Sequence, residues 1–437
     1  MSQVAEQSTL AAAFESFRPQ SAFNAGGLGA VREAAFQRFT AAGFPTTRLE
    51  EWKHTNIAPI ASTEFGLPSV FEIPRATAEP FLFAHELSHR VVLVNGRWSP
   101  ALSSLDALPA GVTIRNLRDA ATNTTAKSAP EWLMRASAGM PFIDLNTAFV
   151  EDGVVIDIAA KAVVTDPIHV VCLSTPAAGP TMVTPRVQIR AGAQAQAFIV
   201  ESYASLSGAA TFTNALTIVD VAEGAMVDHA KLQREAPTAF HLAAMFARLD
   251  RGASFTSHAL TLGGRIARND ISATLAGEGA ECTLDGLYVA DGDSLVDTHT
   301  NIDHAMPHCP SHELYKGILA GKARAVFNGK IIVRQDAQKT NAKQTNKALL
   351  LSDDAQVNTK PQLEIFADDV KCTHGAAIGQ LDEDALFYMQ ARGIALADAR
   401  NLMIHAFAGE VLDGVKEEVV RERAMRLLED KLSLWKV

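Results

Sequence analysis

The sequence has 437 residues, of which 48% are hydrophobic and 20% are charged. This composition is typical of a folded globular protein and excludes a largely disordered chain. Acidic residues outnumber basic ones by 49 to 39, which argues against non-specific binding to nucleic acid or to anionic membranes. The longest apolar runs, such as Val91 to Val94, are far shorter than the roughly 20 residues of a membrane-spanning helix, so none is expected.

The N-terminus and the cysteines both indicate a reducing compartment. Met1 to Phe17 has no basic start followed by an apolar stretch, so we expect no secretory signal and predict a cytoplasmic location. Cys172, Cys282, Cys309 and Cys372 are widely separated and form no C-x-x-C pair. Such spacing predicts neither a disulfide framework nor a self-contained zinc or iron-sulfur motif.

Residues 1–84 are predicted to form an N-terminal helical region. Ala30 to Ala41 carries apolar residues at helical spacing, and Gly43 with Pro45 is expected to end that helix. The segment from Arg48 to Thr55 mixes charges around Trp52. The simplest interpretation makes Trp52 a core anchor and the charges a solvated face.

Residues 85–375 change in character to short runs of strand length and strand composition. These runs are Val91 to Val94, Val154 to Ile158, Ile168 to Leu173, Val187 to Arg190 and Leu216 to Val221. A short turn sequence that ends in Gly-Ala recurs roughly every 30 residues. Its glycines are Gly192, Gly224, Gly252 and Gly279.

A repeat of this size without a helix cannot bury its apolar face alone, so neighbouring copies must stack. Stacked coils also let strands run in parallel without the crossover helices of a βαβ sheet. We therefore predict a mainly β protein with a right-handed parallel β-helix core, and a β-sandwich is the structural alternative.

Residues 376–437 are predicted to form a C-terminal helical domain. Asp382 to Asp384 places negative charge at a helix N-terminus, and Gly393 is suited to end that helix. Two more amphipathic helices are expected over Asp398 to Val411 and Lys416 to Leu434. Helices at both ends would protect the solenoid edges from aggregation.

The densest group of potential metal ligands lies between residues 299 and 312. It contains four histidines and one cysteine, namely His299, His304, His308, Cys309 and His312. Imidazole and thiolate bind zinc and iron, but alternate residues of a strand face opposite sides, so these five cannot all converge. We favour surface or hydrogen-bonded histidines over a closed metal site.

A second candidate site is the sequence Lys371-Cys-Thr-His-Gly375. Cys372 and His374 are two residues apart, which places both on one face of a strand. They supply two ligands, whereas a tetrahedral site needs about four. The residues alone leave two alternatives: a half-site completed by another chain, or a buried cysteine beside a hydrogen-bonded histidine.

Motifs of nucleotide and acyl chemistry are absent from the sequence. Gly317 to Ala323 approaches a P-loop but has too few residues between its glycines and Ala323 in place of the Ser or Thr that binds magnesium. No G-x-S-x-G motif occurs. We therefore expect the chain not to hydrolyse nucleotides by itself.

The run from Asn358 to Gly375, followed by Ile378 to Phe387 and Arg392-Gly393, resembles the C-terminal signature of the SufB/SufD family of the SUF iron-sulfur cluster assembly system, in its SufD form. Further matching segments are His308-Cys-Pro-Ser311, Tyr315-Lys-Gly317, Ala323 to Gly329 and Glu50-Glu-Trp-Lys53. The strong part of the resemblance covers residues 299–412. The chain lacks the cysteine-bearing C-terminal segment with which SufB holds a cluster, which favours the SufD form.

The resemblance implies a non-enzymatic scaffold subunit of a SufBCD-type complex, with a β-helix and helical ends. It would pair with a SufB-like paralogue, dock a SufC-like ABC ATPase, and share a transient iron-sulfur cluster that the isolated chain does not bind tightly. The interface histidine of the family maps onto His374, and Cys372 is a possible second ligand or a structural thiol.

The resemblance further assigns the ATPase contact to the C-terminal helices. Its expected apolar residues are Phe387, Leu402, Met403 and Phe407. Whether the isolated chain forms a homodimer stays open. Two other functions are alternatives: a β-helix carbohydrate-active enzyme, and a metal-storage or metal-sensing protein built on His299 to His312.

Overall fold

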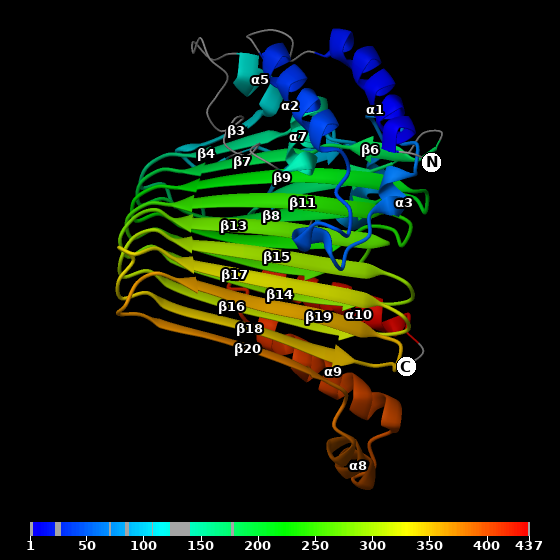
Figure 1. Ribbon diagram of the computed structural model, residues 1–437, viewed down its shortest axis with the longest axis vertical. Helices are drawn as coiled ribbons and strands as arrows, with labels where there is room; N and C mark the ends of the chain where they lie inside the picture. The colour runs from blue at the N-terminus through cyan, green and yellow to red at the C-terminus, as the bar shows by residue number, and fades with distance from the viewer. Residues whose placement is uncertain are drawn as a thin grey trace.

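Two ten-stranded sheets form a parallel β-helix at the centre of the molecule (Figure 1). The computed structural model describes residues 3–21, 28–69, 71–83, 87–106, 108–122, 140–175 and 179–435. One sheet, here called the β20 sheet, has the strand order β2-β1-β5-β8-β10-β12-β14-β16-β18-β20. The other, the β19 sheet, has the order β19-β17-β15-β13-β11-β9-β7-β4-β3, with β6 beside β9. The predicted parallel β-helix is thus confirmed, and the alternative of a β-sandwich was wrong.

The strands of the β20 sheet are β1 (His89–Val94), β2 (Arg97–Trp98), β5 (Ile168–Ser174), β8 (Gln196–Ser205), β10 (Met226–Arg234), β12 (Ser254–Thr261), β14 (Glu281–Ala290), β16 (Pro310–Leu319), β18 (Asn341–Leu350) and β20 (Lys371–Gly379). Those of the β19 sheet are β3 (Val112–Asn116), β4 (Val154–Ile158), β6 (Thr181–Val183), β7 (Arg186–Ala191), β9 (Thr211–Val221), β11 (Phe240–Leu249), β13 (Ile266–Leu275), β15 (Leu295–His304), β17 (Arg324–Val333) and β19 (Gln356–Ile365). The five strands predicted from their composition are β1, β4, β5, β7 and β9.

Side chains alternate between the inner and outer faces along each strand, and the inward-facing ones form the core between the two sheets. Val227 of β10, Phe255 of β12 and Leu284 of β14 point inward and are at most 1% exposed. The turns recur because the chain must reverse direction at the same place in every coil. Gly224 and Gly252 have φ values of +64° and +61°, a backbone conformation that glycine adopts without steric cost.

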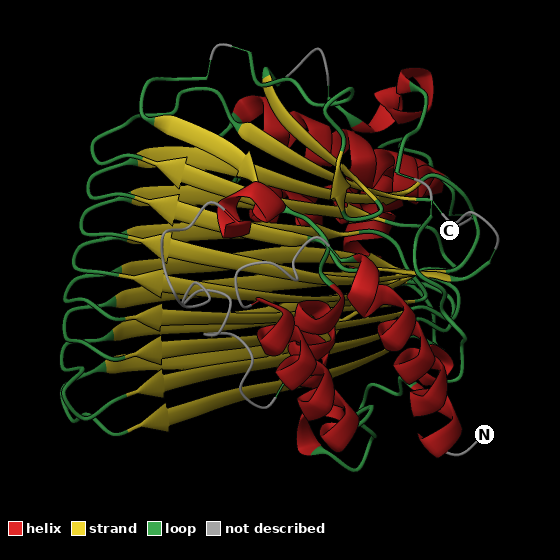
Figure 2. Ribbon diagram, turned by 90° about the horizontal axis from the view of Figure 1, so that it is seen from above, coloured by secondary structure: helices red, strands yellow, loops and turns green. Residues whose placement is uncertain are grey.

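Helices cover the outer faces of both sheets (Figure 2). The N-terminal elements are α1 (Gln3–Phe17), η1 (Arg18–Gln20), α2 (Leu28–Ala42), η3 (Glu50–Trp52), α3 (Ala58–Ala61), α4 (Arg75–Ala78), η4 (Glu79–Phe81), α5 (Leu117–Thr122) and α7 (Pro141–Phe149). Phe39, Trp52 and Phe142 from this region pack with Phe212 and Leu242 of the β19 sheet.

Three C-terminal helices follow the solenoid, as predicted. They are α8 (Glu383–Ala391), α9 (Leu396–Leu412) and α10 (Glu418–Ser433). The Asp382 side chain caps α8, and Gly393 with a φ of +87° follows its end. Ile404 and Val411 of α9, together with Leu428 of α10, pack on the outer face of the β20 sheet.

The described helices include none that is long and apolar enough to cross a membrane. The predicted boundary between residues 84 and 85 lies outside the described residues. At the other end of the solenoid, β20 continues to Gly379 before α8 begins.

Candidate functional site

The last coil of the solenoid carries the Cys-Thr-His segment on an open edge. β20 is the terminal strand of its sheet and pairs with β18 on one side only, as β19 pairs only with β17 (Figure 1). Almost every residue of β20 is exposed, whereas inner strands such as β5 are fully buried. The open edge therefore presents unpaired backbone groups to another molecule.

The register places Cys372 and His374 on the inner face of β20. Cys372 lies opposite Ala342 and His374 lies opposite Gln344, and both of these β18 residues are buried in the core. Cys372 packs with the cluster that contains Ile331. The two candidate ligands thus lie at the C-terminal end of the solenoid interior.

The two side chains differ in accessibility. His374 is exposed and Cys372 is half-buried. Burial raises the pKa of the Cys372 thiol. A metal ion binds the thiolate, so a metal at this position would have to displace the proton.

This pair fits part of an iron or iron-sulfur coordination sphere. Thiolate and imidazole are ligands of such centres, which need about four protein donors. Among the residues that the structure describes, no group of three or more His, Cys, Asp or Glu side chains could hold a metal ion. Further donors would have to come from another molecule.

The histidines between residues 299 and 312 do not converge. His299 and His304 belong to β15, and His312 belongs to β16 of the opposite sheet. His304 is buried and hydrogen-bonds to Ser311, whereas His312 lies 3.5 Å from an oxygen of Asp285. Our preference for separate, hydrogen-bonded histidines agrees with this arrangement.

The C-terminal helices expose part of the predicted contact surface. In Figure 1, α8 extends beyond the last strand. Phe387 of α8 is 73% exposed and Leu402 of α9 is 53% exposed. Met403 and Phe407 are half-buried. The ring of Phe407 packs against the β20 sheet, with its centroid 4.4 Å from the Lys316 ammonium.

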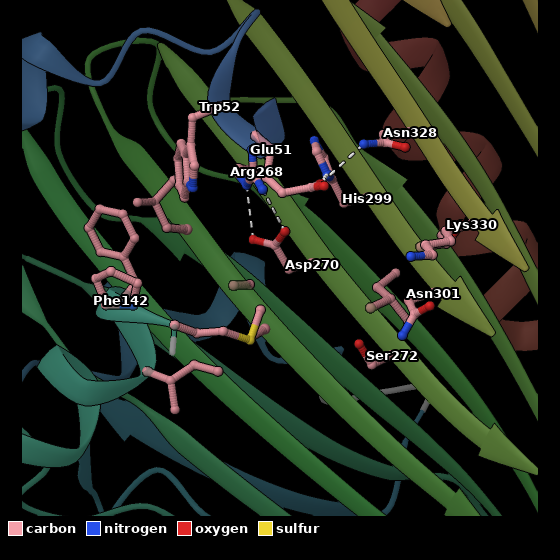
Figure 3. A pocket seen from close by; sticks show the side chains of 18 of the residues that line it. Glu51, Trp52, Phe142, Arg268, Asp270, Ser272, His299, Asn301, Asn328 and Lys330 are labelled. Carbon is pink, nitrogen blue, oxygen red and sulfur yellow. Dashed lines mark hydrogen bonds and ion pairs between the residues drawn. The ribbon is translucent and has the colours of Figure 1, made fainter. Parts of the chain in front are cut away.

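A separate pocket of about 400 Å³ lies on the outer face of the β19 sheet (Figure 3). Trp52 and Phe142 form an aromatic wall that faces polar side chains of the sheet. These polar residues are Arg268, Asp270, Ser272, His299, Asn301, Asn328 and Lys330.

Buried polar contacts beside this pocket hold the N-terminal segment against the solenoid. Buried Arg268 bonds to Asp270 at 2.8 Å and to Asp297 at 2.7 Å. The Trp52 ring centroid lies 3.8 Å from the Arg268 guanidinium carbon. Thr55 donates to Asp297 at 2.6 Å. Trp52 is 9% exposed, which confirms its predicted role as a core anchor.

His299 carries a positive charge within this group. Burial alone would lower its pKa, but Asp297 and Glu51 outweigh burial and raise the pKa to about 9. For Asp297, burial favours the neutral acid, but Arg268 and His299 lower its pKa to about 2. The result is a set of paired charges on the covered part of the sheet.

Sequence reasoning missed Arg268 and Asp270. Their spacing of two residues on a strand places them on the same outer face, which is the one signal available before the fold is known. Their link to Asp297 depends on the register between β13 and β15, which places Arg268 opposite Asp297.

Comparisons with known proteins give one consistent result. Residues 173–407 match the family described as SUF system FeS cluster assembly, SufBD core domain, and residues 18–170 match the SufBD protein N-terminal region. The chain is 31% identical over 398 residues to the iron-sulfur cluster assembly protein SufD of Escherichia coli, with 91% of each chain covered. It is 33% identical over 392 residues to an iron-sulfur cluster assembly SufBD family protein of Synechocystis, covering 88% of this chain and 86% of that protein.

Proposed function

Because this chain belongs to the SufBD family of iron-sulfur cluster assembly proteins of the SUF system, we propose that it is a non-enzymatic scaffold subunit whose open solenoid end completes a cluster site with a second protein. The scaffold has three parts in this proposal: a helical region over residues 1–84, a β-helix core over 85–375 and a helical domain over 376–437. The cluster is its cargo, held transiently and shared with the partner.

One observation carries this proposal. The inner face of the last strand ends in exposed His374 and half-buried Cys372, beside an edge that no described residue covers. Two donors cannot hold a cluster tightly, so the isolated chain is expected to retain none. A partner that brings thiolates to this end would complete the coordination sphere.

The proposed partner at this edge is a SufB-like paralogue with a solenoid of its own. An exposed edge strand accepts another strand through main-chain hydrogen bonds. Apolar side chains beside the edge would add contact area: Ile365 is 40% exposed, Phe366 63% and Ile378 46%. A second copy of this chain fits the same edge chemically, so a homodimer is the proposed state of the isolated protein.

A SufC-like ABC ATPase is the proposed partner of the C-terminal helices. Phe387 and Leu402 present apolar surface that no described residue covers, and Met403 and Phe407 continue it toward the solenoid. The sequence lacks a P-loop, so nucleotide hydrolysis has to be supplied by a separate subunit.

The proposed compartment is the cytoplasm. The described cysteines Cys172, Cys282, Cys309 and Cys372 are all free thiols. Iron and sulfide chemistry also requires reducing conditions. Both features favour a compartment in which thiols stay reduced.

The test is His374→Ala in the full complex. The three subunits are co-expressed and purified anaerobically, and iron and acid-labile sulfide are measured per complex. We expect the variant to assemble normally but to carry several-fold less iron and sulfide, because one ligand of the shared site is lost. His54→Ala, at another exposed histidine, is the matched control. Normal iron content in the His374→Ala complex would overturn the proposed role of His374, and failure of the wild-type subunits to associate would overturn the scaffold proposal.

A further inference from the structure

A column of inward-facing side chains runs beneath His374. The in-register neighbours in β14, β16, β18 and β20 are Leu284, Glu313, Gln344 and His374. Adjacent strands are separated by roughly 4.8 Å, so side chains at neighbouring positions of such a column are within hydrogen-bonding reach. Gln344 therefore lies between a buried carboxyl group and the exposed imidazole.

The lower part of this column is hydrogen-bonded and buried. Glu313 is fully buried and Gln344 is 1% exposed. The Gln344 Nε2 group donates to Glu313 Oε2 at 2.5 Å. Burial raises the pKa of Glu313 to about 7, and the carboxylate that forms above this value can only accept, so at pH 9 the amide of Gln344 turns its nitrogen toward Glu313 and its oxygen away from it.

The oxygen of the Gln344 amide is left without a partner. Gln344 Oε1 is buried and makes no hydrogen bond with any described residue. An unsatisfied buried acceptor destabilises the fold. The next side chain toward the open end is His374, whose imidazole likewise has no hydrogen bond to a described side chain. An imidazole N–H is the donor that this acceptor lacks.

Resting on the function proposed above, we infer that Gln344 is a positioning residue for His374: its Oε1 accepts a hydrogen bond from one ring N–H of His374. The imidazole is then held as a single tautomer, and its second nitrogen is unprotonated and faces the open end. Histidines that bind metals usually donate their other ring N–H to an oxygen acceptor, which fixes the ring and raises its basicity. Glu313 supports the arrangement by fixing the orientation of the Gln344 amide.

The first test measures the tautomer of His374 in the isolated full-length chain. Histidine-selective ¹⁵N labelling with long-range proton–nitrogen correlation distinguishes the two neutral ring forms at pH 9, and loss of a signal in His374→Ala assigns it. We expect one tautomer in the wild type and a mixture in Gln344→Leu. Asn346→Leu is the matched control, because Asn346 is a buried inner amide of the same strand that lies opposite Ala376.

The second test measures iron retention by the reconstituted complex against a chelator. Loss of a hydrogen bond that orients a metal-binding histidine weakens metal affinity about 10- to 100-fold, so Gln344→Leu is expected to lose iron at correspondingly lower chelator concentration. If Gln344→Leu does not fold, Glu313→Leu replaces it, because leucine has no oxygen that can accept from the Gln344 amide and fix its orientation.

The outcomes separate the two proposals. A mixture of tautomers in the wild type, or a single tautomer in Gln344→Leu, overturns the inference about Gln344 whatever the iron measurement gives. Normal iron content in His374→Ala overturns the ligand role of His374, while the tautomer measurement still decides whether Gln344 orients the ring.

Discussion

The two ends of the solenoid differ in how they are closed. At the N-terminal end, the antiparallel strands β2 and β3 are the outermost strands of the two sheets, and helices from the same chain lie over the first coils. At the C-terminal end, β19 is mostly half-buried and β20 mostly exposed. The described part of the chain thus covers the first coils, reaches β19 through the ion pair of Glu50 with Lys360, and leaves the β20 edge unpaired.

The covered part of the solenoid and its open end therefore have different roles, the first in stability and the second in assembly. The part of the solenoid under the N-terminal segment holds buried ion pairs such as Arg268 with Asp297. The open end holds few buried contacts but offers an unpaired edge, two potential ligands and apolar side chains. Changes in the covered part should therefore lower stability, whereas changes at the open end should affect binding and leave the isolated fold intact.

The largest expected effect is on stability, from Arg268→Met. Removing one partner of a buried ion pair weakens the compensation of the remaining charge and costs about 3–5 kcal/mol. Asp297 has no exposed surface, so its carboxylate would be left with His299 and Thr55. Chemical denaturation of the isolated chain measures the loss. Arg324→Met, at an exposed arginine of β17, is the control and should change the unfolding free energy by less than about 0.5 kcal/mol.

The pH dependence of stability gives a second test of the covered part. The pKa of His299 is raised to about 9 in the folded chain, against an ordinary value of 6.5. Because the folded value is the higher one, the stabilisation is fully present below pH 6.5 and is lost as the pH rises through 9. This shift predicts a decrease of about 3 kcal/mol in the free energy of unfolding over that range.

The measurement compares unfolding curves of the wild type and His299→Gln at pH 6.5, 8 and 9.5. Other groups titrate equally in both proteins, so the difference between the two curves isolates His299. The variant should show the flatter dependence. Parallel curves would mean that the ion pairs of His299 with Asp297 and Glu51 do not stabilise the fold.

Local sequence patterns predicted most of the architecture. Strand-length β-branched runs and the recurring turn glycines predicted the stacked coils, and periodic apolar residues with Asp382 and Gly393 at the ends of α8 predicted the C-terminal helices. These features depend on neighbours within a few residues. The spacing of Cys372 and His374 likewise predicted their common face once β20 was assumed to be a strand.

Contacts between distant coils could not be predicted in the same way. Thr55 and Asp297 are 242 residues apart, and their hydrogen bond depends on where the N-terminal segment crosses the sheet. The position of Gln344 beneath His374 depends on the lengths of the two turns that flank β19, which lies between β18 and β20 along the chain. A shift of one residue in the pairing of β20 with β18 would turn every side chain of β20 to the other face.

At the open end, Phe366→Asp should weaken pairing with the SufB-like partner. A charge at an apolar contact of an interface costs about 2 kcal/mol or more, which is about a 30-fold increase in Kd. Val163→Asp is the matched control, because Val163 is 54% exposed and lies in the first coils. Both variants should unfold like the wild type in isolation. Equal binding by Phe366→Asp and Val163→Asp would mean that the partner does not contact this edge.

The smallest expected effect is at the C-terminal helices. Phe387→Ala removes a ring that is 73% exposed, so the isolated chain should keep its stability. Loss of one apolar contact in a protein interface should raise the Kd for the SufC-like ATPase about 10-fold, equivalent to about 1.4 kcal/mol. Leu434→Ala, at a residue that is 78% exposed after α10, is the control. Titration calorimetry with the ATPase measures both. If Leu434→Ala weakens binding and Phe387→Ala does not, the ATPase contacts the end of α10, beside the solenoid, and not α8.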